Sequence, residues 1–261
     1  MLGRLALVFV IAVALTFLFL PLISVFISKS PVQIIADLNT GVAYQALVLS
    51  LQTTLVSLAI TVVFGTPLAL WVAKSTFRGK RFLEVALQMP IVSPPAVAGV
   101  GLLLVFGSAG LLGETFSVFG VSIAFTVVAV VMAQTFIAAP FYVMVTRQAF
   151  EAVDDELLAV SRTLGVTPWR TFWRILVPLA LPGMLSGAAL SLARALGEFG
   201  ATIVFAGNLP GSTQTLPLAI FTVMQSDFEV AVSISALLLS VAFILLLLVS
   251  LINRRSRVLV A

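Results

Sequence analysis

Six long apolar stretches separated by polar connections dominate the hydrophobic pattern of this chain. They cover residues 5–27, 44–72, 85–106, 122–146, 179–206 and 230–252. A helix that crosses a bilayer needs about 20 mostly apolar residues, so each stretch is long enough to span a membrane. The first stretch lacks the short core and small-residue cleavage site of a secretory signal, so we expect it to be retained. The pattern predicts an all-α integral membrane protein with six transmembrane helices.

Composition supports this class and narrows the chemistry. Hydrophobic residues make up 61% of the chain and charged residues 9%, with a mean hydropathy of +1.22. A soluble fold of this length would need far more charge on its surface. Cysteine and histidine are both absent, which removes the thiol nucleophile, the usual general base and the commonest metal ligands. We therefore expect no catalytic residues and no metal site, in a single domain spanning 1–261.

The positive charges sort to one side of the predicted topology. With both termini inside the cell, the outer connections hold only Lys29, and Arg194 lies within a span. The inner side holds the remaining cations, which are Arg4, Lys74, Arg78, Lys80, Arg81, Arg147, Arg162, Arg170, Arg174, Arg254, Arg255 and Arg257. The positive-inside rule therefore favours a multi-pass protein of the cell membrane with both termini cytoplasmic. This basic charge serves topology and contact with the anionic lipid bilayer, so we expect no nucleic-acid partner.

A polar segment, EAVDDELLAVSRTLGVTPWRTFWRILVP, interrupts the apolar pattern at 151–178. Its spacing of capping residues predicts two short helices in a helix–turn–helix. Asp154 or Asp155 is the first N-cap, with Asp155 and Glu156 in the first turn. Gly165 takes the C-terminal left-handed position, while Thr167 is the second N-cap and Pro168 the first helical residue.

Apolar residues lie within this polar segment and need a partner surface. They are Leu157, Leu158, Leu164, Trp169 and Phe172. A plain solvated loop would expose them without purpose, and an interfacial helix could bury some of them in lipid. The third alternative, which we prefer, is a plug for a groove on another protein.

Two spans are interrupted by residues that break helices. Pro90, Pro94 and Pro95 lie in the third span, and proline removes a backbone donor. Such a break is either a packed kink or a discontinuous span that lines a transport path. After the fifth span, GNLPGSTQ cannot lie in lipid as a regular helix and must be at the surface or buried in protein. Residues 215–224 then form a short re-entrant helix.

Arg194 and Glu198 lie one helical turn apart inside the apolar region. A pair at this spacing can neutralise itself on one helix face as a structural ion pair. Charges within a membrane also mark pathways for ions. In that alternative Arg194 attracts a passing anion while Glu198 keeps it from binding too tightly.

The chain lacks the phosphate-binding loop of an ATPase. That loop needs G-x-x-x-x-G-K-[ST], but Gly79-Lys80 is followed by Arg81 and Lys74 occupies the place of the first glycine. An ATP-independent secondary transporter would more often show internal repeats and several protonatable residues, and only Glu198 qualifies. An assembly subunit of a membrane complex would explain the plug but not the broken spans. A membrane enzyme is least favoured, for want of catalytic residues.

The polar segment resembles the EAA loop of permease subunits in ABC importers, E-A-A-x-x-x-G, nine residues, then I-x-L-P. Gly165 matches the glycine, and Ile175 and Pro178 match the end. The acidic first position is replaced by Ala159, with Glu156 one turn earlier. The resemblance implies a cytoplasmic ATPase-coupling loop at 147–178 and a permease fold like that of type I ABC importers. Its coupling residues would be Asp154, Asp155, Glu156, Ser161, Leu164, Gly165, Thr167, Pro168, Trp169, Ile175 and Pro178.

A second stretch, ARALGEFGATIVFAGNLPGSTQTLPLAIF at 193–221, resembles permeases of molybdate-type importers. Sulfate permeases share the A-R-x-x-G-E-[FY]-G core. The resemblance, from about Ala43 to Ile252, implies import of a tetrahedral oxyanion: molybdate or tungstate, with sulfate or thiosulfate as the alternative. Its path or gate residues would be Pro94, Pro95, Arg194, Gly197, Glu198, Gly200, Asn208 and Gln214.

The resemblance also implies an assembly. Two copies of this chain would surround a central path as a homodimer, with two cytoplasmic ABC ATPase subunits below and an extracytoplasmic oxyanion-binding protein above. The chain itself would bind no cofactor, because ATP and magnesium would belong to the ATPase. It would alternate between inward- and outward-open states, and the binding protein would set most of the selectivity.

Overall fold

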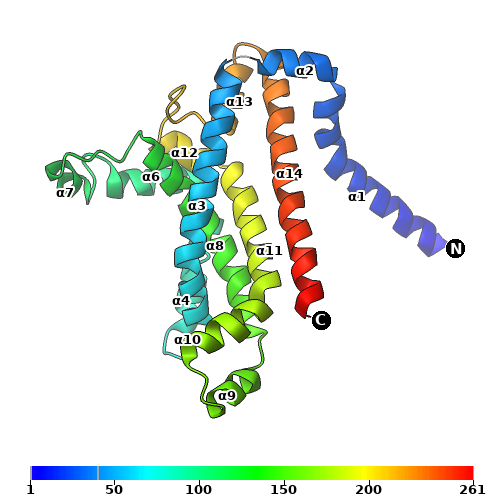
Figure 1. The fold of residues 1–261 in the computed structure, drawn as a ribbon. Helices are drawn as coiled ribbons and strands as arrows, with labels where there is room; N and C mark the ends of the chain where they lie inside the picture. The colour runs from blue at the N-terminus through cyan, green and yellow to red at the C-terminus, as the bar shows by residue number, and fades with distance from the viewer. Residues whose placement is uncertain (1, 40, 261) are drawn as a thin grey trace.

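The computed structural model describes residues 2–39 and 41–260, which fold into helices joined by turns (Figure 1). The long helices are α1 (Leu2–Ile27), α3 (Gly41–Lys74), α8 (Val127–Glu151), α11 (Val177–Leu196) and α14 (Phe228–Val260). The shorter ones are α2 (Pro31–Leu38), α4 (Lys80–Ala86), α5 (Met89–Val92), α6 (Pro95–Phe106), α7 (Gly113–Val118), α9 (Asp155–Thr163), α10 (Pro168–Thr171), the π-helix η1 (Phe172–Leu176), α12 (Gly200–Phe205) and α13 (Leu216–Met224). The predicted all-helical membrane architecture is confirmed.

Among the described residues, five helical segments are long and apolar enough to cross a membrane, and a bent pair of helices provides a sixth if it is counted as one span. The break predicted in the third span, 85–106, is confirmed, and it is sharp: Lys80–Val92 and Pro95–Phe106 meet at 108°. Ser93 is extended at the break, because the residue before a proline avoids the helical region. The fifth predicted span, 179–206, is wrong at its end, since α11 stops at Leu196 and α12 begins at Gly200. The fourth begins later than predicted, at Val127, after the N-cap Thr126.

The core is the contact of α8 with α3 and α11, and α14 covers α11 on the other side (Figure 1). Small residues allow the helices to lie close together. A Cβ on Gly65 of α3 would lie 3.0 Å from the ring of Tyr142, and one on Gly187 of α11 would lie 3.2 Å from the Tyr142 carbonyl. The Tyr142 hydroxyl is hydrogen-bonded to Thr66, 2.7 Å away. This packing fixes the scaffold that carries the broken spans.

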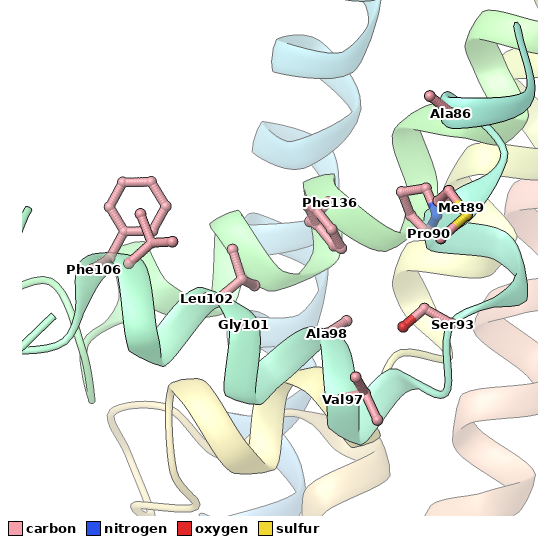
Figure 2. A pocket seen from close by; sticks show the side chains of 11 residues that line it. Ala86, Met89, Pro90, Ser93, Val97, Ala98, Gly101, Leu102, Phe106 and Phe136 are labelled. Carbon is pink, nitrogen blue, oxygen red and sulfur yellow. The ribbon is translucent and has the colours of Figure 1, made fainter. Parts of the chain in front are cut away.

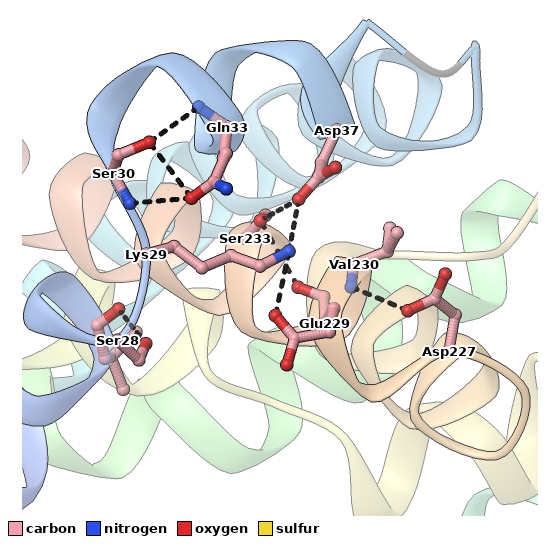
Figure 3. Close-up of polar contacts among 10 residues, drawn as sticks. Ser28, Lys29, Ser30, Gln33, Asp37, Asp227, Glu229, Val230 and Ser233 are labelled. Carbon is pink, nitrogen blue, oxygen red and sulfur yellow. Dashed lines mark hydrogen bonds and ion pairs between the residues drawn. The ribbon is translucent and has the colours of Figure 1, made fainter.

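An ion-pair cluster closes the end of the molecule opposite α9 (Figure 3). Lys29, in the turn between α1 and α2, lies 2.6 Å from Asp37 of α2 and 3.3 Å from Glu229 of α14. Ser233 donates a further hydrogen bond to Asp37. The lysine lowers the pKa of Asp37, and the hydrogen bond to Asp37 raises the pKa of Lys29. The cluster, which sequence reasoning missed, attaches α2 to the start of α14.

Helix α1 leans away from the bundle, and most of its side chains are exposed (Figure 1). The first residues of α1 and the last of α14 point toward the end of the bundle that carries α9. The side chains of Arg254, Arg255 and Arg257 lie outside the described part.

Candidate functional site

Helix α9 has the predicted start and end. Asp154 is the N-cap, and its carboxylate accepts a hydrogen bond of 2.9 Å from the Glu156 amide. Gly165 is left-handed with φ 72°. The Gly165 amide donates to the Arg162 carbonyl, and the Val166 amide donates to the Ser161 carbonyl, both at 3.0 Å. This pair of bonds is a Schellman motif, which needs a residue with positive φ at its centre. Gly165 therefore turns the chain back toward the bundle.

The second predicted short helix is corrected. Pro168 does occupy the first turn after the extended Thr167, but the Thr167 side chain makes no capping bond. Helix α10 continues through the π-helix into α11 instead of ending. The Val177 amide donates to the Phe172 carbonyl, five residues back. The wider turn lies directly before Pro178, which has no amide to donate, and Ile175 packs into the core beside it.

The segment from Asp154 to Thr171 is fixed to the bundle from inside. Leu158 is buried in a cluster with Phe150 and Leu176, and the Ser161 and Thr171 hydroxyls are 2.7 Å apart. Lys74 of α3 reaches Asp155 at 2.6 Å and donates to the Val153 carbonyl. Its ammonium lowers the pKa of Asp155.

A second set of ion pairs lies beside this attachment and was missed from the sequence. Arg147 of α8 contacts both Glu84 of α4 and Glu151 at the end of α8, at 2.9 Å each. Lys80 approaches Glu151 at 3.8 Å. These side chains are at most about one third exposed. They join α4, the first part of the broken span, to the end of α8, which leads into α9. No local sequence pattern connects α4 with α8, so these ion pairs could not be predicted from the sequence.

The outer face of the segment is an exposed apolar patch. Leu164 is 75% exposed and Trp169 is 69% exposed. Leu157 and Val160 lie beside Leu164 on one face of α9, and Trp173 packs edge-on against Trp169 with ring centroids 5.6 Å apart. Glu156 is exposed and forms no ion pair with another described residue. An apolar patch with a free acidic residue at its edge suits a protein groove.

Arg194 and Glu198 form the predicted pair. Arg194 Nη1 lies 2.6 Å from Glu198 Oε2, and the Glu198 side chain is 1% exposed. The other carboxylate oxygen accepts a 2.8 Å hydrogen bond from the Ala201 amide, at the start of α12. Glu198 is therefore engaged on both oxygens and holds the break between α11 and α12, which includes Gly197. The partly exposed Arg194 keeps further donors available.

The break between α5 and α6 lies against the break between α11 and α12. A Cβ on Gly200 would lie 2.7 Å from the Cβ of Pro95, and a Cβ on Gly99 would lie 2.8 Å from the Ala201 carbonyl oxygen. Helices α6 and α12 are therefore in close contact at two points, one at Gly99 and one at Gly200. The contact begins directly after Pro94. The structure brings the predicted residues Pro94, Pro95, Gly197 and Gly200 into one region, next to the Arg194–Glu198 pair.

Asn208 and Gln214 form a separate group. The Gln214 side-chain amide donates to the side-chain oxygen Oδ1 of Asn208 at 2.9 Å. The Asn208 side-chain amide in turn donates to the Thr222 hydroxyl of α13 at 2.7 Å. The loop before α13 is non-helical, as predicted, with left-handed Gly207 and Gly211. No hydrogen bond or ion pair of the described residues joins this group to Arg194. Thr222 was missed because an isolated threonine in an apolar helix carries no pattern.

The described part of the chain offers no candidate metal site. In residues 2–39 and 41–260, no three His, Cys, Asp or Glu side chains are placed to hold a metal ion.

Comparison with known proteins places the chain in a family. Residues 65–258 match the model for "Binding-protein-dependent transport system inner membrane component". The "Molybdenum transport system permease protein ModB" of Mycobacterium tuberculosis is 40% identical over 89% of this chain and 88% of its own length. The "Probable sulfate transport system permease protein cysT" of Chlorokybus atmophyticus is 35% identical over 78% of this chain and 72% of its own length.

A solved structure shows the same fold. The crystal structure of a bacterial ABC transporter involved in the import of the acidic polysaccharide alginate superposes with a TM-score of 0.75 at 16% identity, covering 97% of this chain and 96% of that one. The family match spans most of the chain and includes both broken spans and the α9–α10 segment. This chain therefore belongs to the family of inner membrane components of binding-protein-dependent transport systems.

Proposed function

We propose that this chain is the permease subunit of an ATP-driven importer that carries a tetrahedral oxyanion, with molybdate as its first substrate and tungstate as an equivalent one. The chain itself is a permease subunit whose ATPase is a separate protein. The exposed apolar patch on α9 and α10 carries the proposal. It is held rigidly by the Lys74–Asp155 pair and the Schellman turn at Gly165, yet it covers nothing in this chain.

The patch is the proposed contact for the ATPase. We assign coupling to Asp154, Asp155, Glu156, Ser161, Leu164, Gly165, Thr167, Pro168, Trp169, Ile175 and Pro178, within the loop 147–178. Trp169 and Leu164 would enter the groove, and Glu156 would stand in for the acidic residue of the EAA pattern. Two ATPases on two copies of this chain would suit a two-fold axis with the path along it. Both termini would then lie in the cytoplasm, on the α9 side.

ATP binding would draw the two ATPases together and move each α9–α10 unit as a rigid body. The ion pairs of Arg147 with Glu84 and Glu151 would pass this movement to α4. The bend at Ser93 would then displace α6 against α12, where Gly99 and Gly200 meet their neighbours. An extracytoplasmic binding protein must favour one of the two states, because a ligand shifts an equilibrium only by differential affinity.

The path is assigned to Arg194, Glu198 and the region around Pro94, Pro95, Gly197 and Gly200. Arg194 attracts the anion, and Glu198 keeps the site from binding it too tightly. Asn208 and Gln214, which are hydrogen-bonded to each other and to Thr222, stabilise the loop before α13. Such a weak site leaves most of the selectivity to the binding protein.

Molybdate is preferred over sulfate because the molybdenum permease is more similar to this chain and matches more of it than the sulfate permease does. The test is ATP hydrolysis in proteoliposomes that hold this chain, its copurified ATPase and the native binding protein. We expect stimulation by molybdate and by tungstate but not by sulfate. Stimulation by sulfate alone would assign the chain to sulfate import. Substrate uptake without any ATPase would instead make it a secondary transporter.

A further inference from the structure

Two arginines lie where α3 connects to α4, Arg78 in the connection and Arg81 in the first turn of α4, and neither has an ion-pair partner among the described residues. Lys74, Lys80 and Arg147 surround this connection, and each is neutralised by a carboxylate. Arg78 and Arg81 are exposed, and neither pairs with a carboxylate among the described residues. The local charge is therefore concentrated on these two side chains. Two adjacent guanidinium groups are well suited to a phosphate.

Aromatic side chains place this connection at the membrane surface. Trp71, in the last turn of α3, stacks on Phe77 with ring centroids 5.0 Å apart. Tryptophan at the end of a spanning helix is typical of the headgroup level. In Figure 1, α9 projects beyond this connection at the lower end of the bundle. The patch on α9 is thus offered to the cytoplasm, while Arg78 and Arg81 remain at the bilayer surface.

An exposed apolar stripe runs from these arginines into the membrane. Phe82 is 79% exposed, Val85 57%, Met89 62% and Val92 80%. Their spacing places them on one side of the helical stretch from Lys80 to Val92, which is about 20 Å long at 1.5 Å per residue. One leaflet of the hydrocarbon core is about 15 Å thick. The stripe therefore extends from the headgroup level to the middle of the bilayer, which is the course of one acyl chain.

Met89 of the stripe also lines an apolar cavity inside the bend between α5 and α6 (Figure 2). The cavity has a volume of about 590 Å³ and begins at Ala86 and Met89. Val97 and Leu102 of α6 and Phe136 of α8 line the rest, and Ser93 is the one polar side chain on its wall. A hydrated oxyanion gains nothing from such a wall, because its charge would find almost no donor there. A hydrocarbon tail suits it.

We propose that the α3–α4 connection, the stripe and the cavity form a binding site for an anionic phospholipid of the cytoplasmic leaflet. Arg78 and Arg81 hold the phosphate, one acyl chain lies along Phe82, Val85 and Met89, and its end fills the cavity at the bend. A bound tail supports α6 where the span is broken. The lipid touches neither the transported substrate nor the ATPase, although it lies on the broken span through which the proposed movement passes.

The test is competition between two lipids for the purified full-length chain, read by native mass spectrometry. Phosphatidylglycerol and phosphatidylcholine with identical acyl chains are offered in equal amounts. Each arginine near the surface contributes on the order of a fivefold preference for an anionic headgroup. We expect the wild-type chain to retain phosphatidylglycerol at least tenfold better, and the variant Arg78→Gln/Arg81→Gln to show a ratio near one. The matched control, Arg162→Gln/Arg170→Gln, removes the same charge from α9 and α10 and should keep the preference.

The tail is tested separately. Gly101 of α6 lines the cavity and has nothing within 4 Å of its Cβ position, so Gly101→Leu fills the space without a clash. We expect it to reduce retained phosphatidylglycerol, while inorganic phosphate at millimolar concentration should not displace the lipid. An unchanged lipid ratio in the double arginine variant would overturn the proposal. So would full retention in Gly101→Leu, or displacement by phosphate alone, which would make this a simple anion site.

Discussion

Replacing Gly99 with alanine tests the contact between the two broken spans. Gly99 lies on α6 where it crosses α12, and the added Cβ would lie 2.8 Å from both the Ala201 carbonyl oxygen and the Val204 Cβ. Ordinary contacts between carbon atoms are about 3.5–4.0 Å. Both neighbours are fixed close to the backbone, so no side chain can rotate away. The helices must separate to admit the methyl group.

The size of the effect follows from two opposing contributions. Overpacking of a tight contact costs about 1–3 kcal/mol. Alanine in place of glycine inside a helix returns about 0.5–1 kcal/mol. Central values of about 2 and about 0.75 kcal/mol leave a net destabilisation of about 1 kcal/mol for Gly99→Ala, within limits of about 0–2.5 kcal/mol, which corresponds to a decrease on the order of 2–4 °C in the unfolding midpoint.

Gly101→Ala provides the matched control on the same helix. Nothing lies within 4 Å of its Cβ position, so only the helical gain remains, and we expect an unchanged or slightly raised midpoint. The assay is thermal unfolding of both variants in the same detergent, followed by substrate uptake in proteoliposomes. We expect Gly99→Ala to lose most uptake and Gly101→Ala to retain it. Equal midpoints and equal uptake for the two variants would refute the assignment of α6 and α12 as a close-packed gate.

Three further predictions concern the coupling loop, the buried pair and the outer cluster. Gly165→Ala should lower the folding stability by about 1–2 kcal/mol because of its left-handed backbone, and it should uncouple ATP hydrolysis from uptake. Gly165→Asn should retain more coupling, because asparagine tolerates that conformation. Parallel ATPase and uptake assays measure the difference. Glu198→Gln should leave Arg194 without its ion pair, so the affinity of the permease for the anion should rise while its turnover falls. Binding of labelled molybdate and uptake kinetics measure both effects. Unchanged kinetics would favour a purely structural pair. Because the pKa of Asp37 is lowered and that of Lys29 is raised, the pair should stabilise the fold between about pH 4 and pH 10, and this contribution should be lost as pH falls through the folded pKa of Asp37 or rises past that of Lys29. Asp37→Asn should remove the acid-side dependence and weaken the alkaline one, because Lys29 keeps its contact with Glu229; unfolding midpoints of both proteins across pH measure it.

The sequence predicts best what depends on local physics. The apolar lengths identify the spans, and the caps at Asp154 and Gly165 are set by nearby backbone chemistry. The prolines at Pro94 and Pro95 indicate a break in the third span but cannot state its angle. That angle depends on what α6 packs against, which is α12, a hundred residues later.

Contacts between distant segments were beyond reach for the same reason. Arg147 and Glu84 are 63 residues apart, and their 2.9 Å contact brings α4 to α8 beside the packing of α5 on α8. Pro168 and Thr167 suggested a separate short helix because they are typical of a helix start. Nothing local indicated that the helix would pass through a π-turn into α11.

Cysteine cross-linking between the coupling loop and the ATPase tests the central claim most directly. The chain contains no cysteine, so a single introduced residue is unambiguous. We would compare Leu164→Cys, on the exposed patch, with Phe119→Cys, which is 76% exposed but lies after α7, away from α9. The account predicts a cross-link to the ATPase from position 164, sensitive to ATP, and none from position 119. A cross-link from 119 alone, or none from 164 in a complex that hydrolyses ATP, would contradict it.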